Sequence, residues 1–281
     1  MASSSSTFLL TGTTADVVAL LTLGVTRAAR KSGLPHSLAP AIAAGMLLWL
    51  GAAAILARSG VLSAGTASPP RWPLLPLTAL ATLSLLGLNP AFRRLLPEIP
   101  PWQPVALQAF RVGVELAFWR LHAEGVAPVQ VTFEGRNFDA LVGLAAPAVA
   151  AGIASGRIGP RLAIAWNLSG LALLVNAIGT VATSAPGPLH RDWPGEPFVA
   201  IAAWPVVWIP APLAPTGIFL HVVSLRQAIA SPERLGADPA WSPMRSERIA
   251  GRLPQSSRSL GGKSYLNLST RGRFEPRDRV A

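Results

Sequence analysis

The feature that most constrains this chain is a series of long apolar blocks with few or no ionisable residues. Each block is rich in Leu, Val, Ile and Ala and is long enough, as a helix, to cross a hydrocarbon layer roughly 30 Å thick. Only 13% of the 281 residues are charged, about half the share that is typical of a soluble domain. The sequence therefore predicts an all-α, polytopic membrane helix bundle.

Seven blocks are candidate transmembrane helices. Charge-poor runs bounded by Arg, Pro and Gly clusters place them near residues 8–26, 38–57, 73–92, 105–123, 139–156, 162–184 and 198–225. The fourth block is unlike the others because it carries Arg111, Glu115, Arg120 and His122. An amphipathic helix lying along the membrane surface is the alternative for this block.

The distribution of Lys and Arg favours seven spans, with the N-terminus outside and the C-terminus in the cytoplasm. The inner loops 27–37, 93–104 and 157–161 then hold seven Lys and Arg residues, and the outer segments hold four. If residues 105–123 did not cross, the six-span arrangement with the basic tail inside would place more of these residues outside than inside, against the positive-inside tendency. Residues 1–7 contain no basic residue, so we expect them to be retained rather than removed as a secretory signal.

The C-terminal segment 231–281 has a different composition from the apolar part, 1–230. It is rich in Arg, Ser, Gly and Pro with only scattered Leu and Ile, which predicts a disordered cytoplasmic tail. Residues 226–281 hold 11 Lys and Arg and five acids. Such a tail beside a bilayer predicts anionic lipid headgroups as its partner, ahead of nucleic acid.

The charges of the fourth block are arranged along one helical face. At about 100° per residue, Gln108, Arg111, Glu115 and His122 fall on one stripe. Isolating a charge in lipid costs at least about 2.5–3.5 kcal/mol, so this face is expected to point into the bundle. Two interpretations remain open: Arg111 and Glu115 form a pair that determines the helix register, or Glu115 titrates on an ion or proton path.

Asp16 is an isolated carboxylate in the first block. Either it pairs with a cation of the fourth block, Arg111 or Arg120, or it marks the outer start of a helix that begins near Thr14 and caps the backbone N–H groups there.

The seventh block contains Pro205, Pro210, Pro212 and Pro215. Because proline removes backbone donors and disfavours helical angles in the preceding residue, a helix broken near its middle is predicted. A broken helix exposes backbone dipoles to a substrate in many transporters. The alternative is a kink that neighbouring helices tolerate.

The most polar stretch of the apolar part lies between the fourth and fifth blocks. Residues 128–139 carry Glu134, Arg136, Asn137 and Asp139, and the facing loop 187–196 adds His190 and Asp192. If the two loops converge, they supply groups for acid/base chemistry or for recognising a charged solute. The alternative is local: Asn137 or Asp139 caps the next helix, and Glu134 pairs with Arg136.

The octapeptide 132–139, Thr-Phe-Glu-Gly-Arg-Asn-Phe-Asp, follows the 108–120 pattern. Together they resemble a family of uncharacterised bacterial multi-span membrane proteins over about residues 75–225. The resemblance implies a multi-pass protein of the bacterial plasma (inner) membrane and implies no particular chemistry.

Three classes of function are compatible with these patterns. The first is binding or transport of a small polar or charged solute, the second is a structural or partner-binding subunit, which includes a homo-oligomer, and the third is a membrane enzyme with an outer-face acid/base site. With no Cys, thiolate metal sites are excluded. Nucleotide, zinc-protease and serine-hydrolase motifs are absent from the sequence, and we expect no cofactor and no metal.

Overall fold

The computed structural model describes residues 2–63 and 69–235, and every regular element within them is helical. The predicted all-α class is therefore confirmed for this part of the chain. The described residues belong to one compact unit, and most of the predicted tail lies outside the described residues.

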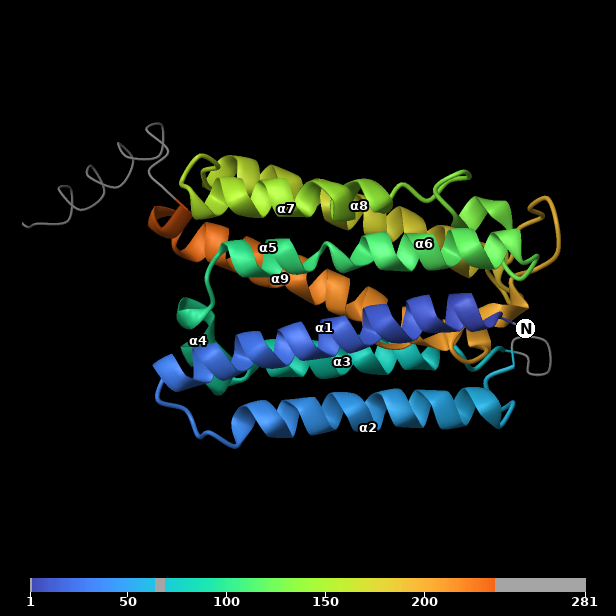
Figure 1. The fold of residues 1–281 in the computed structure, drawn as a ribbon, viewed down its shortest axis with the longest axis horizontal. Coiled ribbons are helices and arrows are strands. Elements are labelled where there is room, and N and C mark those ends of the chain that lie inside the picture. The colour runs from blue at the N-terminus through green and yellow to red at the C-terminus, as the bar shows by residue number, and fades with distance from the viewer. Residues whose placement is uncertain (1, 64–68, 236–281) are drawn as a thin grey trace, which may run out of the picture. The chain divides into compact units, whose positions relative to one another are not determined.

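Three long helices form the first part of the bundle: α1 (Ser4–Lys31), α2 (Leu38–Arg58) and α3 (Leu74–Leu88). They run along the long axis of Figure 1 in alternating directions. α1 begins where the Ser3 hydroxyl accepts a hydrogen bond from the Ser6 N–H, as an N-cap residue does.

α3 ends at Asn89 and is followed by the short helix α4 (Pro90–Leu95) and the 3₁₀ turn η1 (Leu96–Glu98). The chain bends by 64° at this point. Asn89 caps α4 by accepting from the Ala91 N–H at 2.8 Å, and Pro90 occupies the first turn, where its missing N–H is harmless. The predicted block 73–92 thus contains a sharp bend near its end.

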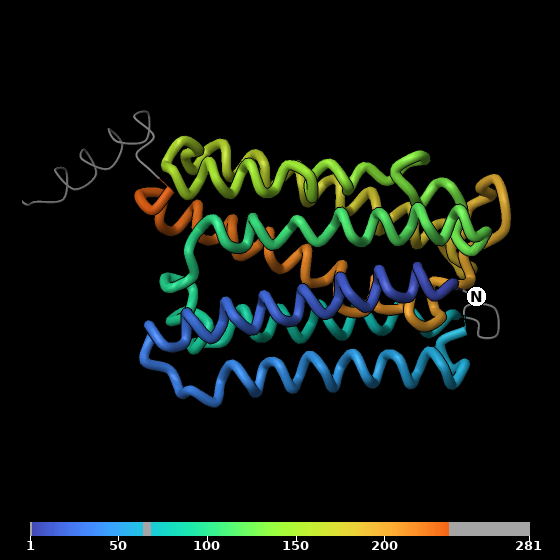
Figure 2. Tube along the Cα trace, in the orientation of Figure 1, coloured from blue at the N-terminus to red at the C-terminus, as the bar shows by residue number. Residues whose placement is uncertain are grey.

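The predicted block 105–123 is two helices, α5 (Trp102–Leu107) and α6 (Phe110–Ala123). They follow one another in the same direction, and the tube in Figure 2 shows the chain passing from one to the other without turning back. α7 (Ala140–Ala154) packs against both, and α8 (Pro160–Ser184) follows with Pro160 in its first turn. Between α6 and α7 lies the 3₁₀ turn η2 (Val129–Val131).

The proline-rich seventh block is wound more continuously than predicted. After the 3₁₀ turns η3 (Val199–Ala202) and η4 (Val206–Trp208), a π-helical turn η5 (Ile209–Leu213) leads directly into α9 (Ala214–Ala230). The predicted break is therefore wrong. The wider turn accommodates Pro210 and Pro212 without ending the helix, and residues 206–230 behave as one span-length helix.

The folded part of the chain extends beyond the predicted boundary at residue 230. The 3₁₀ turn η6 (Pro232–Leu235) follows α9, and Leu235 is buried in a cluster with Val105, Ile153 and Ala228. This apolar contact orders residues 231–235, which the sequence analysis assigned to the disordered tail. The remainder of that prediction, 236–281, lies outside the described residues.

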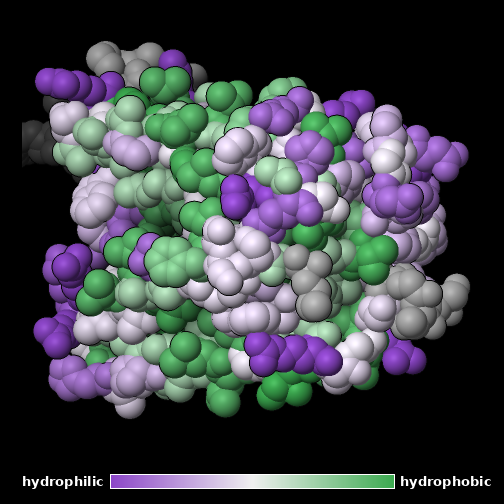
Figure 3. Space-filling view, turned by 45° about the vertical axis from the view of Figure 1, so that its right-hand side comes forward, coloured by the Kyte–Doolittle hydropathy of each residue, from purple (hydrophilic) through white to green (hydrophobic). Residues whose placement is uncertain are grey.

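Four helices of the described part are long and apolar enough to cross a membrane, and the bent α3–α4 segment makes up to five. The four are α1, α2, α8 and the segment 206–230, while α7 is apolar but shorter. In Figure 3 hydrophobic side chains cover much of the face shown, and hydrophilic side chains lie along its left and right edges, near its middle and at its lower edge. The described part exposes many leucines, among them Leu47, Leu85 and Leu168, which is typical of a protein embedded in lipid.

Candidate functional site

The central polar feature of the bundle is a buried ion pair between Arg111 and Asp139. Arg111, in the first turn of α6, donates from Nη1 to Asp139 Oδ1 at 2.6 Å, and both side chains are almost fully buried. Asp139 immediately precedes α7. The predicted Arg111–Glu115 pair is therefore wrong, because the guanidinium pairs with a carboxylate from another element instead.

Further acceptors hold the Arg111 guanidinium in position. Its Nε donates to Gln108 Oε1 at 3.0 Å, and its Nη1 lies 3.5 Å from the Gly170 carbonyl of α8. Gln108 in turn donates to the Gly217 carbonyl of α9 at 3.1 Å. The remaining nitrogen, Nη2, has no hydrogen-bond partner in the described part of the chain and lies against Gly217, where a Cβ would be 3.2 Å from it. Four elements thus meet around one guanidinium.

Glu115, one turn further along α6, contacts the amide of Asn137. Asn137 Nδ2 donates to Glu115 Oε1 at 2.6 Å and to the Val131 carbonyl at 3.0 Å. Both side chains are buried. The second carboxylate oxygen, Glu115 Oε2, is also buried and has no hydrogen-bond partner among residues 2–63 and 69–235.

These contacts show that the polar segment 128–139 does not stay at the end of the bundle. Its last residues, Asn137 and Asp139, lie level with the first two turns of α6 and not with the end of α6 at Ala123. The segment therefore folds back along α6, and α7 begins inside the bundle. Irregular backbone at such depth is tolerated only when protein surrounds it, and Thr132 and Asn137 are fully buried here.

Local contacts explain why residues 128–139 adopt this fold. The Asn137 N–H donates to the Thr132 carbonyl and the Arg136 N–H to the Gln130 carbonyl, which closes a tight loop. Gly135 lies so close to the backbone that a Cβ would be 2.3 Å from the Val129 carbonyl oxygen. Asn176 of α8 donates to the Arg136 carbonyl at 2.6 Å. A larger residue at 135 would open this loop.

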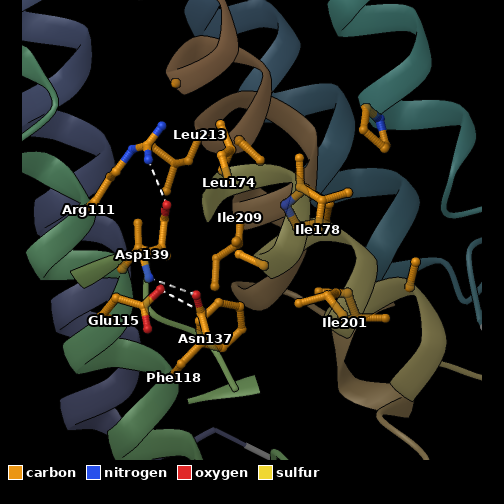
Figure 4. Close-up of a pocket in the computed structure, with 18 of the residues that line it drawn as sticks. Arg111, Glu115, Phe118, Asn137, Asp139, Leu174, Ile178, Ile201, Ile209 and Leu213 are labelled. Carbon is orange, nitrogen blue, oxygen red and sulfur yellow. Dashed lines mark hydrogen bonds and ion pairs between the residues drawn. The ribbon is translucent and has the colours of Figure 1, made fainter. Parts of the chain in front are cut away.

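Arg111, Glu115, Asn137 and Asp139 form the polar wall of a cavity of about 320 Å³ (Figure 4). The other labelled side chains around it are apolar and come from α6, α8 and the segment 201–213. Three aromatic rings also line it: Trp72, Phe110 and Phe118. A mostly apolar cavity with a few convergent polar groups is the usual form of a small-molecule site.

A second hollow of about 300 Å³ adjoins this cavity. The two share Trp72, Pro73, Ala182 and Leu189 in their linings. The rest of the second lining is made of Pro69, Pro70 and residues 186–188, at the end of the bundle where α3 begins and α8 ends. The second hollow therefore lies beside the cavity, on the side of that end of the bundle.

Four of the predicted site residues lie outside the cavity lining. Glu134 accepts from Trp119 Nε1 at 2.9 Å, and the Arg136 guanidinium lies 5.3 Å from the centre of the Trp193 ring, so the predicted local Glu134–Arg136 pair is wrong. His190 and Asp192 are exposed. Glu134, Arg136, His190 and Asp192 are therefore not brought into one pocket with Asn137 and Asp139.

The prediction for Asp16 is wrong in both of its forms. Asp16 lies in the middle of α1, whose first residue is Ser4, so it does not mark a helix start. Its side chain is exposed and makes no ion pair within the described ranges, while Arg111 pairs with Asp139 and Arg120 with Glu124. The outward position follows from the register of α1, which turns Leu10, Thr14 and Val17 inward instead.

A buried polar cluster on α8 and α9 escaped the sequence analysis. His221 Nδ1 lies 2.8 Å from Asn167 Oδ1, and Asn167 Nδ2 donates to Ser224 Oγ at 2.9 Å. His221 packs against Gly170, next to the carbonyl that faces Arg111. One sequence signal indicates this cluster: the spacing that places Gly217, His221 and Ser224 on one face of a helix.

Among the described residues, no group of three or more His, Cys, Asp or Glu side chains is placed to hold a metal ion. No protein-family model matches the chain, and no curated protein or solved structure is significantly similar to it. The resemblance of residues 132–139 to a bacterial membrane-protein family therefore stays a prediction.

Proposed function

We propose that the protein spans the bilayer seven times and binds a small solute at the polar wall of its internal cavity, as the first step of transport. The supporting observation is the cavity itself, an apolar space lined by Glu115, whose second carboxylate oxygen is buried and has no partner among the described residues. A buried polar atom without a partner is costly to fold around, and a bound solute with a polar group offsets that cost.

Seven spans follow if the paired and shorter helices are counted with the five candidates. Residues 102–123 continue in one direction through α5 and α6, and α7 returns beside them. α7 has 15 residues, about 22 Å of helix at 1.5 Å per residue. The segment 128–139, whose last residues fold back along α6, completes this passage in the depth that α7 leaves unspanned.

The charges at the two ends of the bundle support the proposed orientation. The 31–38 loop, α4 and the 154–160 turn lie at the left end of Figure 1, and the start of α1 and the segments 59–63, 69–73 and 185–205 lie at the right end. The inner loops 27–37, 93–104 and 157–161 hold seven Lys and Arg, against four in the outer segments. By the positive-inside tendency the left end is cytoplasmic.

The location and partners proposed from the sequence are consistent with this arrangement. We place the chain in a bacterial plasma membrane, on the resemblance of residues 132–139, with lipid around the bundle. Anionic headgroups are the proposed partner of the basic C-terminal segment 231–281, since each cation near such a surface contributes about 1 kcal/mol.

Filling the cavity tests the proposed function. Ala177 of α8 is buried and lines the cavity, whereas Ala172 of the same helix is exposed and does not. We would measure stabilisation of the purified protein against heat by three soluble probes that share a phenyl ring: benzyltrimethylammonium, N,N-dimethylbenzamide and phenylacetate. At least one probe should stabilise the wild type and the Ala172→Phe variant but not Ala177→Phe. If no probe acts, or if Ala177→Phe responds like the wild type, the cavity is not a binding site.

A further inference from the structure

The charges of the polar wall are not balanced. Arg111 carries one positive charge, and Glu115 and Asp139 each supply a carboxyl group. The cavity lining contains no other titratable residue: α3 and α8 contribute only apolar side chains and Pro, and α9 adds Ala214 and Gly217. One of the two carboxyl groups therefore has no cation of its own.

The geometry identifies Glu115 as the carboxyl group in excess. Asp139 is bound to the Arg111 guanidinium at 2.6 Å, whereas Glu115 accepts only from the neutral Asn137 amide. An ionised carboxylate in an apolar interior is strongly disfavoured unless a cation or a proton compensates it. Glu115 Oε2, which is buried and without a partner in the described ranges, is the atom at which that compensation is missing.

The rest of the lining indicates what kind of cation fits. Trp72, Phe110 and Phe118 bring aromatic rings to the lining of the same cavity, and Ile201, Ile209 and Leu213 add apolar side chains to it (Figure 4). Aromatic faces attract cations with weakly hydrated, alkylated head groups. A space of about 320 Å³ is the size of a small organic molecule and is far larger than a metal ion requires.

Resting on the proposed function, we infer that the solute is a small organic monocation with an apolar or aromatic body, whose positive head pairs with Glu115. In the empty cavity the carboxyl group holds a proton. When the cation binds, that proton leaves to water, so one positive charge replaces another and the net charge of the cavity is unchanged. The adjoining hollow at Pro69, Pro70 and residues 186–188 lies beside the cavity and is the route that we propose for both.

An anionic solute is the opposite possibility, because Arg111 Nη2 also has no partner in the described part. Four features disfavour it. Asp139 already compensates the charge of Arg111. Gln108 accepts from Nε and the Gly170 carbonyl accepts from Nη1, while Nη2 lies against Gly217. An anion would also meet two carboxyl groups in the same wall.

Binding of the proton and of the cation at one carboxylate predicts a specific pH dependence. The titratable groups that face Glu115 are Arg111 on its own helix and Asp139 before α7, with His221 of α9 on the far side of Arg111. One proton competing with one cation weakens the apparent affinity by up to about tenfold for each pH unit that the pH falls.

The test measures dissociation constants of benzyltrimethylammonium, N,N-dimethylbenzamide and phenylacetate by titration calorimetry on the full chain in lipid nanodiscs. We expect the cation to bind tightest and Glu115→Gln to weaken its binding about a hundredfold, to remove the pH dependence, and to leave the amide unaffected. Glu134→Gln, which changes an exposed carboxylate outside the cavity, is the matched control and should bind like the wild type. Glu115→Asp keeps the charge and should restore part of the affinity.

Other outcomes separate this inference from the proposed function. If the amide or phenylacetate binds at least as well as the cation, or if Glu115→Gln binds the cation normally, the cavity is a binding site for another class of solute and the inference is wrong. If none of the three probes binds the wild type, both are wrong. Thermal unfolding of each variant shows whether a loss of affinity comes from misfolding, and the Glu115→Asp result decides the matter if Glu115→Gln does not fold.

Discussion

At the scale of single residues, the account depends on the buried pair of Arg111 and Asp139. Asp139→Asn removes the carboxylate to which the charged, buried guanidinium is bound. Breaking a buried pair from one side typically destabilises by about 3–5 kcal/mol. We expect a loss of that size in denaturant unfolding of the purified protein.

Two controls show whether that loss comes from the unpaired charge. The double variant with Arg111→Met removes the charge as well and should recover much of the stability. Asp192→Asn, in an exposed loop, should unfold like the wild type. Equal losses in the single and double variants would show that the effect is one of packing and not of charge.

A second residue-scale prediction concerns pH. It involves Glu124, which joins the start of α1 to the end of α6. Partial burial raises the pKa of Glu124, but hydrogen bonds from the Ser3 hydroxyl and N–H and from Ser6, together with Arg120, outweigh it and hold the pKa below its ordinary value of 4.5. Because the folded state binds the proton less readily than the unfolded state, the carboxylate stabilises the fold above that ordinary value. This contribution is lost as the pH falls through the lowered pKa.

Glu124→Gln should therefore flatten the acid side of the stability curve, measured as the unfolding temperature between about pH 6 and pH 3. The effect is small, since the group lies near solvent. Glu196→Gln, an exposed carboxylate in the 185–205 segment, should retain the slope of the wild type. If Glu124→Gln leaves the pH dependence of the unfolding temperature unchanged, the contact of Glu124 with the start of α1 does not stabilise the fold.

At the scale of elements, α8 and α9 approach each other across Gly170. A Cβ at this position would be 2.4 Å from Cε1 of the buried His221 ring. We expect Gly170→Ala to separate the two helices locally and to destabilise the protein by about 1–3 kcal/mol, as overpacking does. Unfolding of the variant in detergent measures the change.

Gly179 is the matched control on the same helix, because no atom lies within 4 Å of its Cβ position. Gly179→Ala should be neutral or stabilising, since alanine favours the helix by up to about 1 kcal/mol. If both alanine variants unfold alike, the contact between Gly170 and His221 does not determine the spacing of α8 and α9.

The elements also show what the sequence can and cannot predict. The predicted span 38–57 matches α2 closely, because the apolar run is uninterrupted and ends at Arg58, which determines where the helix ends. The pairing of Arg111 was mispredicted because spacing along α6 says nothing about a carboxylate 28 residues away. Asn137 and Asp139 were recognised as candidates, but only the return of residues 128–139 into the bundle brings them to Glu115 and Arg111.

The prolines of the seventh block illustrate a different limit. Pro210 and Pro212 predict a broken helix if the backbone can only be α-helical or unwound. A single π-helical turn contains both prolines, and the helix continues to Ala230. Single-turn π segments are rare in proteins, but those that occur often lie at functional sites. Here Ile209, Pro210 and Leu213 line the cavity.

At the scale of the whole molecule, residues 102–123 must cross the bilayer, so that the segment 128–139 begins on the side opposite the 154–160 turn. Glu134 before α7 and Ser155 after it are both exposed. They therefore report on the two connections that precede and follow α7. The natural chain contains no Cys, so a single introduced Cys is the only thiol.

The most direct test is to introduce Glu134→Cys or Ser155→Cys and to treat intact cells with a membrane-impermeant maleimide. The account predicts that Cys at 134 is labelled in intact cells and that Cys at 155 is labelled only after the membrane is opened. Labelling of position 155 from outside, or protection of position 134 until the cells are opened, would contradict the crossing of residues 102–123 and with it the proposed orientation of the cavity.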